Sequence, residues 1–283
     1  MNDGSDSDSR LRRPSAVRTL RVGALKVSYV PDGAMLLKPH TAPPVAADRH
    51  WVTYGAYLND TRRLVANTGG LLVESGDRAL LIDAGFGPRA VPEDPAHPYR
   101  GAVHGGLLPG NLALLGRSPD DIETVAFTHL HPDHTGWALT DPPLFARAGF
   151  AVPKGEWDDR DEALGALEAR TRPLLAGEEV FPGVHAMALP GHTPGHTGFV
   201  IASGGSRLLA FGDALLSPLQ IRHPEWSAIR EADPAAAEHH RRALVTELLR
   251  PDTVGFGIHF ADVVFGRART DGTATATADW HPL

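Results

Sequence analysis

Six consecutive residues of this chain combine three imidazoles with one carboxylate. The run reads His129-Leu130-His131-Pro132-Asp133-His134. Neutral imidazole and carboxylate are the side chains that bind divalent transition metals while leaving positions open for water. Neither packing nor solubility requires such a density of these groups. We therefore interpret the run as a metal-binding segment.

The stretch before this run has the pattern of a strand. Ile122 to Phe127 alternates and contains β-branched residues, which is typical of a β-strand. The histidines therefore follow the C-terminal end of a strand, in a loop whose side chains can converge on one point.

Three further segments place His or Asp after apolar stretches. Val184–Leu189 precedes a glycine- and proline-rich tight turn that carries His192 and His196. Asp213 ends another apolar stretch, and His259 lies within the strand-like run Gly255–Phe260. Four strand ends are thus expected to deliver potential ligands.

Taken in order, these motifs resemble those of the metallo-β-lactamase-fold hydrolase superfamily. The matching set is His-x-His-x-Asp-His, Gly-His-Thr-Pro-Gly-His, the Gly212-Asp213 strand end, the late His259 and the earlier run Leu80-Leu81-Ile82-Asp83-Ala84-Gly85. The resemblance extends from about Leu20 to the C-terminus, and its specificity comes from the ordered set rather than from any single motif. It implies an α/β (α+β) fold, a four-layer αββα sandwich with metals at one edge.

The resemblance also implies a site for two metal ions. The implied ligands are His129, His131 and His192 for one ion, Asp133, His134 and His259 for the other, and Asp213 as a bridge between both together with a hydroxide. His129 and His131 are two residues apart, so they point the same way on an extended segment. Asp133 and His134 follow Pro132, where the chain turns, and can face a second ion.

Nitrogen and oxygen ligands of this kind suit Zn²⁺, with Mn, Fe, Co and Ni as alternatives. The chain has no Cys, so thiolate ligands are excluded. Two ions roughly 3.5–4 Å apart lower the pKa of a bridging water and stabilise the attacked and leaving oxygens. Asp133 or Asp213 is expected to accept a proton as the intermediate breaks down. Asp83 and His196 are expected to support the ligands without binding metal.

Two departures from relatives bear on the substrate. Acyl-homoserine lactonases of the superfamily carry a Tyr shortly after the bridging Asp, and many other relatives carry a His three residues after it. This chain has Ala214, Leu215 and Leu216 there, which predicts an apolar floor beside the metals. We therefore favour a hydrophobic ester or lactone as the substrate. The candidate substrate contacts are Trp51, Tyr54, Phe86, His223 and Trp226.

Other activities are compatible with the same metal site, because one fold supports many reactions. The alternatives are a thioesterase similar to glyoxalase II, a phosphotriesterase, and a secondary-metabolism tailoring enzyme that acts on an acyl or polyketide-like intermediate. A metal-binding protein without catalysis is the alternative outside enzymes. The complete ligand set argues against that last reading.

Composition narrows the partners of the protein. The chain has 283 residues and a formal net charge of −7 at pH 7, which argues against binding nucleic acid by phosphate neutralisation. No apolar run approaches the length of a membrane span, and Met1–Ser9 lacks the apolar core of a signal peptide. We expect a cytoplasmic monomer or homodimer that acts on a small molecule, without a nucleic-acid or membrane partner.

The sequence predicts a short tail and one long domain. Residues 1–16 are polar, which predicts a disordered tail before a single domain over residues 17–283. Two segments share the pattern of strand, glycine turn, Arg, apolar strand and terminal Asp, namely Gly70–Asp83 and Gly198–Asp213. This weak internal repeat predicts a domain built from two similar halves.

The remaining segments predict a mixture of strands and helices. Leu20–Val30 is expected to form the first strand, and the proline-rich Pro31–Asp60 a loop that covers part of the protein. Helices are expected over Asp159–Arg170 and from Asp233 to about Arg250, with Asp233 as N-cap and Pro234 at the first helical position. Strands that alternate with helices indicate α/β or α+β layering.

Overall fold

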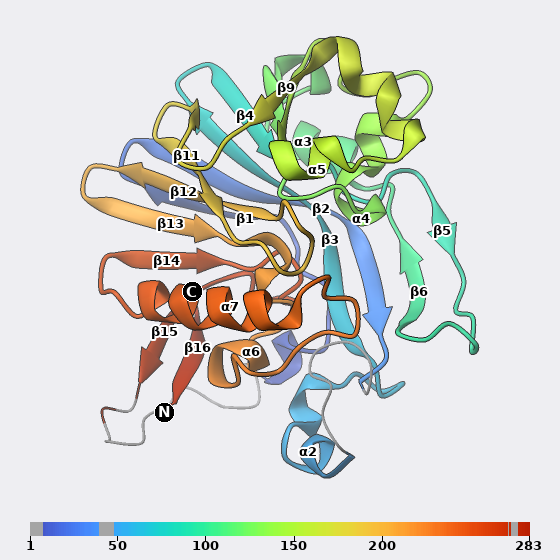
Figure 1. The fold of residues 1–283 in the computed structure, drawn as a ribbon, viewed down its shortest axis with the longest axis vertical. Coiled ribbons are helices and arrows are strands. Elements are labelled where there is room, and N and C mark those ends of the chain that lie inside the picture. The colour runs from blue at the N-terminus through green and yellow to red at the C-terminus, as the bar shows by residue number, and fades with distance from the viewer. Residues whose placement is uncertain (1–7, 40–47, 271, 273–276) are drawn as a thin grey trace.

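Two β-sheets form the centre of the molecule (Figure 1). The computed structural model describes residues 8–39, 48–270, 272 and 277–283. Within them, nine strands form the first sheet and seven form the second.

The first sheet is antiparallel on one side and parallel on the other. From edge to edge its strands are β5 (Ala90–Val91), β6 (Arg100–His104), β2 (Leu25–Leu37), β3 (Leu64–Ser75), β4 (Arg78–Ile82), β7 (Thr124–Ala126), β8 (Gly149–Pro153) and β9 (Thr171–Leu174), and β1 (Arg18–Val22) pairs with β2. Strands β4, β7, β8 and β9 are parallel, with Ile82 opposite Ala126. The carboxyl ends of β4 and β7 therefore meet at one edge of the sheet.

The second sheet is almost entirely antiparallel. Its order is β10 (Glu179–Phe181), β11 (Val184–Ala188), β12 (Thr197–Ser203), β13 (Ser206–Ala210), β14 (Thr253–Phe256), β15 (Phe265–Thr270) and β16 (Ala278–Pro282). Only β13 and β14 are parallel among these described strands, with Ala210 opposite Phe256. Their carboxyl ends also share an edge, so the segments that follow them begin side by side.

Helices cover the outer faces of both sheets. The α-helices are α2 (Asp48–Thr53), α3 (Leu108–Leu114), α4 (Pro132–Thr135), α5 (Lys154–Asp158), α6 (Leu219–Arg222) and α7 (Pro234–Leu248). The 3₁₀ helices are η1 (Gly55–Tyr57), η2 (Pro119–Asp121), η3 (Gly136–Leu139), η4 (Glu162–Arg170) and η5 (Gly212–Ala214). In Figure 1, α7 lies across the second sheet, and α3 and α5 lie beside the first sheet, away from the second.

The apolar core follows these layers. Between the sheets, side chains such as Tyr29 and Leu71 pack with Phe199 and Leu208. A second cluster joins the first sheet to α3, η3 and η4, and a third joins the second sheet to α7. The molecule thus has the layer order helix, sheet, sheet, helix, which confirms the predicted αββα sandwich.

The polar N-terminal segment differs from the prediction of disorder. Residues 1–7 lie outside the described part, but residues 8–16 are packed on the domain. Arg10 Nη2 donates to the Asp262 carbonyl oxygen at 2.8 Å, and the buried Ser15 N–H donates to Asn67 Oδ1 at 2.9 Å. The buried Asp262 carboxylate also pairs with Arg13 and Arg18. Polarity alone did not reveal these partners, because Asn67 lies 52 residues from Ser15 and Asp262 lies 252 residues from Arg10. The single domain over residues 17–283 stays a prediction.

Two early segments also differ from expectation. Leu20–Val30 spans a turn between two strands, β1 and β2, rather than one strand. Gly23 has φ +56° in that turn, and a Cβ there would lie 2.4 Å from the Ser203 carbonyl oxygen. The first part of Pro31–Asp60 is not a loop, because β2 continues to Leu37 through a register shift at Pro31 and Gly33. Residues 40–47 of that expected loop lie outside the described part.

The later predictions fare better. Both predicted hairpins are present, as β3–β4 and β12–β13. Helix α7 begins after Asp233, whose side chain accepts from the N–H groups of Ala235 and Ala236. The expected helix at Asp159–Arg170 is a 3₁₀ helix, η4. The strand expected over Gly255–Phe260 ends at Phe256, so His259 lies in the turn that follows.

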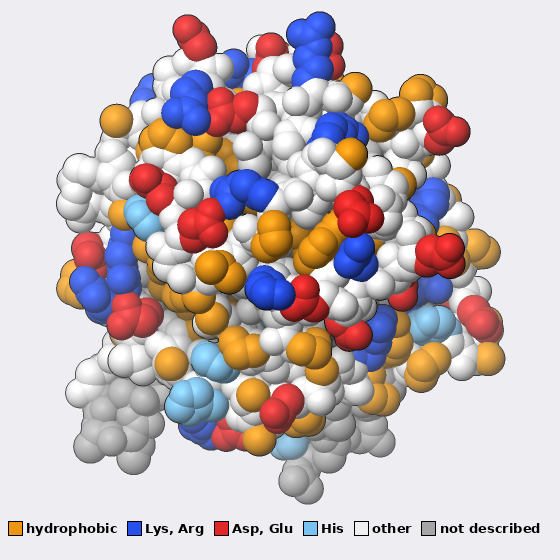
Figure 2. Space-filling view, turned by 45° about the horizontal axis from the view of Figure 1, so that its top comes forward, with side chains coloured by type: hydrophobic (Ala, Val, Ile, Leu, Met, Phe, Trp, Pro, Cys, Tyr) orange, Lys and Arg blue, Asp and Glu red, His pale blue; other side chains and the backbone are white. Residues whose placement is uncertain are grey.

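The surface carries charges of both signs. On the face in Figure 2, Lys and Arg side chains are interspersed with Asp and Glu. Among the described residues, the helices fall short of the length and apolar character needed to cross a membrane.

Candidate metal centre

The first histidine loop is held by a carboxylate at the end of the neighbouring strand. Asp83 follows β4 and accepts hydrogen bonds from the backbone N–H of Thr128 at 2.8 Å and from its hydroxyl at 2.9 Å. The second carboxylate oxygen also contacts His134 Nδ1 at 2.9 Å. Because β4 and β7 are parallel neighbours, their carboxyl ends lie side by side, and the Asp83 side chain can contact Thr128 directly. Asp83 thereby orients the loop and one imidazole without lining the cavity.

The chain turns within the motif. His131 has an extended backbone, and Pro132 opens the short helix α4. His129 and His131 therefore project from extended chain, whereas Asp133 and His134 project from a helical turn. The proline position in the sequence thus separates the two pairs, as predicted.

A tight turn between β11 and β12 carries His192 and His196. Gly191 has φ +137°, and a Cβ there would lie 2.4 Å from Ala237 N, so α7 approaches the turn closely. Burial lowers the pKa of His196 to about 4, so its imidazole is neutral. Its Nδ1 donates to the Leu189 carbonyl oxygen at 3.1 Å, and its Nε2 accepts from Asp213 N–H at 3.0 Å. His196 therefore orients Asp213.

A residue that sequence reasoning missed joins the two histidine loops. Glu156 of α5 accepts from Leu130 N–H at 3.2 Å and from Gly195 N–H at 2.8 Å, one bond to each loop. Its side chain is buried. A lone Glu in a short helix gives no signal in the sequence, because its two partners are backbone groups of distant segments.

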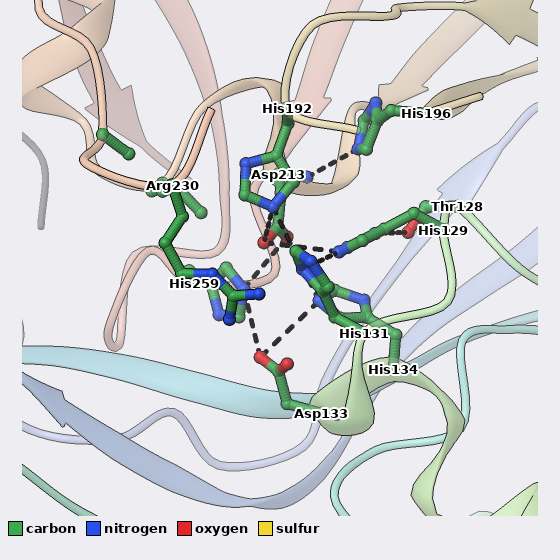
Figure 3. A network of polar contacts seen from close by, with 12 residues as sticks. Thr128, His129, His131, Asp133, His134, His192, His196, Asp213, Arg230 and His259 are labelled. Carbon is green, nitrogen blue, oxygen red and sulfur yellow. Dashed lines mark hydrogen bonds and ion pairs between the residues drawn. The ribbon is translucent and has the colours of Figure 1, made fainter. Parts of the chain in front are cut away.

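The predicted ligands converge in two groups around Asp213 (Figure 3). The first trio is His129, His131 and His192, and the second trio is Asp133, His134 and His259. Asp213 Oδ2 lies 3.3 Å from His192 Nε2 and 3.7 Å from His129 Nε2. Asp213 Oδ1 lies 3.0 Å from His259 Nε2 and 3.2 Å from His134 Nε2. One carboxylate oxygen therefore faces each trio.

Within each group the donor atoms face one another. In the first trio, His131 Nδ1 lies 2.8 Å from His129 Nε2 and 3.2 Å from His192 Nε2. In the second trio, Asp133 Oδ2 lies 3.7 Å from both His134 Nε2 and His259 Nε2. His259 is oriented from behind, since its Nδ1 donates to the Asn67 carbonyl oxygen at 2.7 Å.

The pKa shifts differ between the two trios. Burial lowers the pKa of His129 and His192 well below its ordinary value, which leaves neutral imidazoles with free lone pairs. Burial alone would raise the pKa of Asp213, but His259, His134 and His129 hold it well below its ordinary value. The pKa of His134 is raised despite burial, because Asp213, Asp83 and Asp133 surround it. The carboxylates around the second trio therefore stabilise a positive charge there, whether of a proton or of a metal ion.

Unpartnered buried atoms support the same conclusion. His134 Nε2 and His259 Nε2 are buried and lie 3.2 Å and 3.0 Å from the buried Asp213 Oδ1, yet none of these three atoms makes a hydrogen bond of good geometry among the described residues. Buried polar groups in folded proteins are normally satisfied. Converging imidazole nitrogens and carboxylate oxygens fit a divalent cation in each group, with the nitrogen and oxygen chemistry that zinc accepts.

A cavity of about 370 Å³ opens above these groups. Its apolar wall consists of Met35, Leu37, Phe86, Val91, Val103, Leu216, Ala228 and Ile229. Its floor consists of His131, Asp133, His192, Asp213 and His259. Leu216 thus provides the apolar surface beside the floor that the sequence predicts, whereas Leu215 is buried in the core.

The structure separates the five predicted substrate contacts. Phe86 lines the cavity, but Trp51, Tyr54, His223 and Trp226 do not. The last three contact one another, with Tyr54 Oη 2.6 Å from His223 Nε2 and the His223 and Trp226 rings stacked at 3.9 Å. Trp51, Tyr54 and Trp226 instead pack in an apolar cluster with Met35 and Leu37 behind the cavity wall, and His223 stacks on Trp226.

Other cavity residues went unrecognised in the sequence. Tyr99 and Arg230 line the cavity, together with Ala228 and Ile229. His223 was expected to contact the substrate, but Ala228, Ile229 and Arg230, which follow it in the chain, line the cavity instead. No motif distinguishes these positions in the sequence.

Comparison with known proteins agrees with the geometry. The sequence profile of the metallo-beta-lactamase superfamily matches residues 70–258. The N-acyl homoserine lactonase AiiA of Bacillus thuringiensis subsp. kurstaki is 30% identical over 154 residues, which are 49% of this chain and 60% of that protein. The match therefore spans less than two thirds of this relative.

Solved structures show the same fold over nearly the whole chain. AidC, described as a dizinc quorum-quenching lactonase in complex with a product, superposes with a TM-score of 0.79 at 21% identity, covering 95% of this chain and 98% of that one. A probable metal-dependent hydrolase from Staphylococcus aureus superposes with a TM-score of 0.80 at 20% identity, covering 93% and 99%.

Proposed function

Because the chain belongs to the metallo-beta-lactamase superfamily, we propose that it is a metal-dependent hydrolase that cleaves an ester or lactone bond of a hydrophobic small molecule. One observation carries the proposal. Asp213 presents one carboxylate oxygen to each of two trios of ligand atoms. That arrangement is suited to two divalent ions, most simply two Zn²⁺.

The ligands divide as the resemblance implies. His129, His131 and His192 would hold one ion, Asp133, His134 and His259 the other, and Asp213 would contact both. When bound, such a pair supplies an activated water at neutral pH and polarises the carbonyl under attack.

The protein supplies orientation and a proton acceptor. Asp213 is buried and fixed by the hydrogen bond to His196, whereas Asp133 is partly exposed to the cavity. Of the two carboxylates expected to accept a proton, Asp133 is therefore better placed to hold it during breakdown of the intermediate and pass it to the leaving oxygen.

The apolar wall supports a hydrophobic substrate. Leu216, Phe86 and Met35 offer contacts for an acyl chain, and no side chain of the Ala214–Leu216 segment offers a hydroxyl. Similarity to N-acyl homoserine lactonases favours a lactone within this class. Apolar contacts favour long acyl chains over short ones by about 0.8 kcal/mol per buried methylene.

A substrate panel with the metal-loaded protein tests the proposal. Acyl lactones of increasing chain length, aryl esters, a thioester and a phosphotriester are compared by kcat/KM. We expect the highest values for lactones or esters, rising with chain length. Turnover restricted to the thioester or the phosphotriester would contradict the substrate class. Two bound metals with no turnover of any compound would indicate a protein that binds metal without catalysis.

A further inference from the structure

Arg230 differs from the other cations that line the cavity. Arg89 donates to the carbonyl oxygen of Phe86 at 2.9 Å, and Arg100 donates to that of Gly101 at 3.2 Å. Arg230 instead donates through Nη1 to Tyr99 Oη at 2.6 Å. Its Nε and Nη2 have no hydrogen-bond partner, and it forms no ion pair, among the residues that the structure describes. The N–H groups of Nε and Nη2 thus remain free to bind a ligand.

Tyr99 orients this guanidinium in two ways. Its hydroxyl accepts from Nη1, and its ring lies under the guanidinium carbon, 5.4 Å from the ring centroid. The other side of Tyr99 packs edge-on against His97, with centroids 4.6 Å apart. A planar guanidinium held in this way offers donors in a fixed direction, which a flexible ammonium does not.

The loop that carries Arg230, residues 223–232, is fixed from beneath by Arg241 of α7. Arg241 is almost fully buried and donates to Pro224 O at 2.7 Å, Ser227 Oγ at 2.9 Å and Glu231 Oε1 at 2.5 Å. Burying an ion pair contributes little to stability, because desolvation offsets the attraction. We interpret the Arg241–Glu231 pair as a means of fixing one loop conformation.

The same loop is hydrogen-bonded to the turn that carries His192. Ala232 N–H donates to the His192 carbonyl oxygen at 3.2 Å, and Asp233 N–H donates to that of Gly191 at 2.9 Å. Figure 3 shows the Arg230 side chain extending from its loop toward His259 and Asp133. Its free donors therefore lie beside the floor of the cavity, where a substrate would be held.

We propose that Arg230 is a specificity-determining residue, positioned by Tyr99, that donates hydrogen bonds to a carbonyl oxygen of the substrate outside the scissile bond. The preferred substrate then carries an amide or keto group next to the lactone or ester, in addition to an apolar chain. Arg230 is exposed at the mouth of the cavity, so an aliphatic substrate without such an acceptor would leave its donors to water and would lack one charge-assisted hydrogen bond. This inference rests on the proposed hydrolase function.

Two lactones and three variants test the inference. The lactones are N-hexanoyl-homoserine lactone, which has an amide carbonyl, and an alkyl-substituted γ-lactone of the same length, which has none. Arg230→Met removes the donors, Tyr99→Phe removes the hydroxyl that orients them, and Arg242→Met on the exposed face of α7 is the matched control. Metal content and melting temperature are measured for each variant.

We expect Arg230→Met to raise KM for the amide lactone about tenfold, with kcat little changed, because a hydrogen bond to a charged donor is lost. Tyr99→Phe should raise that KM about threefold. The alkyl lactone should change less than about twofold in every variant. Equal effects on both lactones, or no effect of Arg230→Met, would overturn the inference. If Arg230→Met folds poorly, Arg230→Lys replaces it and should give an intermediate KM.

A binding measurement separates this inference from the proposed function. If the wild-type protein hydrolyses neither lactone, the proposed function is wrong for this class, and both compounds become plain ligands for calorimetry with the metal-loaded protein. The role of Arg230 then stands if Arg230→Met weakens binding of the amide lactone about tenfold and leaves the alkyl lactone unchanged. Equal affinities of the two proteins for the amide lactone, or no binding by the wild type, overturn it.

Discussion

The floor and the wall of the cavity are held in place by different interactions. Behind the floor, the side chains of Asp83, Glu156 and His196 accept hydrogen bonds from backbone N–H groups of the segments that carry the proposed ligands. The apolar wall instead consists of strand and loop residues, such as Met35 and Leu216, that are partly exposed to the cavity.

This difference separates reactivity from selectivity. Directional hydrogen bonds to buried acceptors fix atoms closely, as ligand atoms around a metal require. Apolar packing tolerates substitutions of similar volume. We therefore expect substitutions in the floor to affect metal content and kcat, and substitutions in the wall to affect KM.

The largest effect is expected from Asp213→Asn. The variant loses the negative charge that faces both trios, so we expect kcat/KM to fall at least about thousandfold and metal content to drop. Metal analysis and steady-state kinetics measure both. Because Asn nearly preserves shape, the metal-free variant should still fold, with a lower melting temperature since it loses the carboxylate that His259 and His134 stabilise. Near-normal activity with full metal content would show that the floor does not depend on this carboxylate.

A smaller effect is expected from Glu156→Gln. The amide keeps one acceptor oxygen and loses the other, so one of the two loops is released. Losing such a supporting contact typically lowers metal affinity about 10- to 100-fold, and competition with a chelator measures it. Glu162→Gln, at an exposed position of η4, is the control. Unchanged affinity in Glu156→Gln would mean that the loops are fixed by other contacts.

The wall should respond differently to Leu216→Ala. Removing part of an apolar surface should raise KM for a long-chain lactone about three- to tenfold, leave a short-chain lactone less affected, and preserve metal content. The control is Leu114→Ala, because Leu114 is 79% exposed. A fall in kcat or in bound metal would break the distinction between floor and wall.

The last effect is on stability rather than on activity and concerns Tyr57, in the apolar cluster behind the wall. Burial, aided by Asp279, raises its pKa from 10.0 to about 12. Between those values the unfolded chain loses the phenol proton and the folded chain keeps it, so the free energy of unfolding falls as pH rises. Tyr57→Phe should remove up to about 2 kcal/mol of that fall, measured by urea unfolding. An identical pH dependence in the variant would contradict this assignment.

The same contrast explains what the sequence could predict. The proposed ligand residues lie in short motifs near strand ends, and both predicted hairpins are present, so local sequence patterns were enough to predict the fold and the residues that converge on the floor. His259 lies in a turn rather than a strand, yet its order in the chain still indicated its group. Glu156 escaped prediction because its partners are backbone groups.

The wall was predicted less well, because it depends on contacts between distant segments. Phe86 lines it as expected, but Trp51 and Trp226 fill the cluster behind it, and aromatic composition could not distinguish the two locations. Tyr99 and Arg230 meet across more than a hundred residues. The packed segment 8–16 has the same origin, since Asp262 lies far along the chain.

Metal titration tests the central claim most directly. The protein is stripped with a chelator and titrated with Zn²⁺, while bound metal and lactone hydrolysis are followed together. We expect two equivalents to bind and full activity to require the second, with neither equivalent bound normally by Asp213→Asn. A protein that binds one equivalent or none, or that keeps full activity without metal, would contradict the claim.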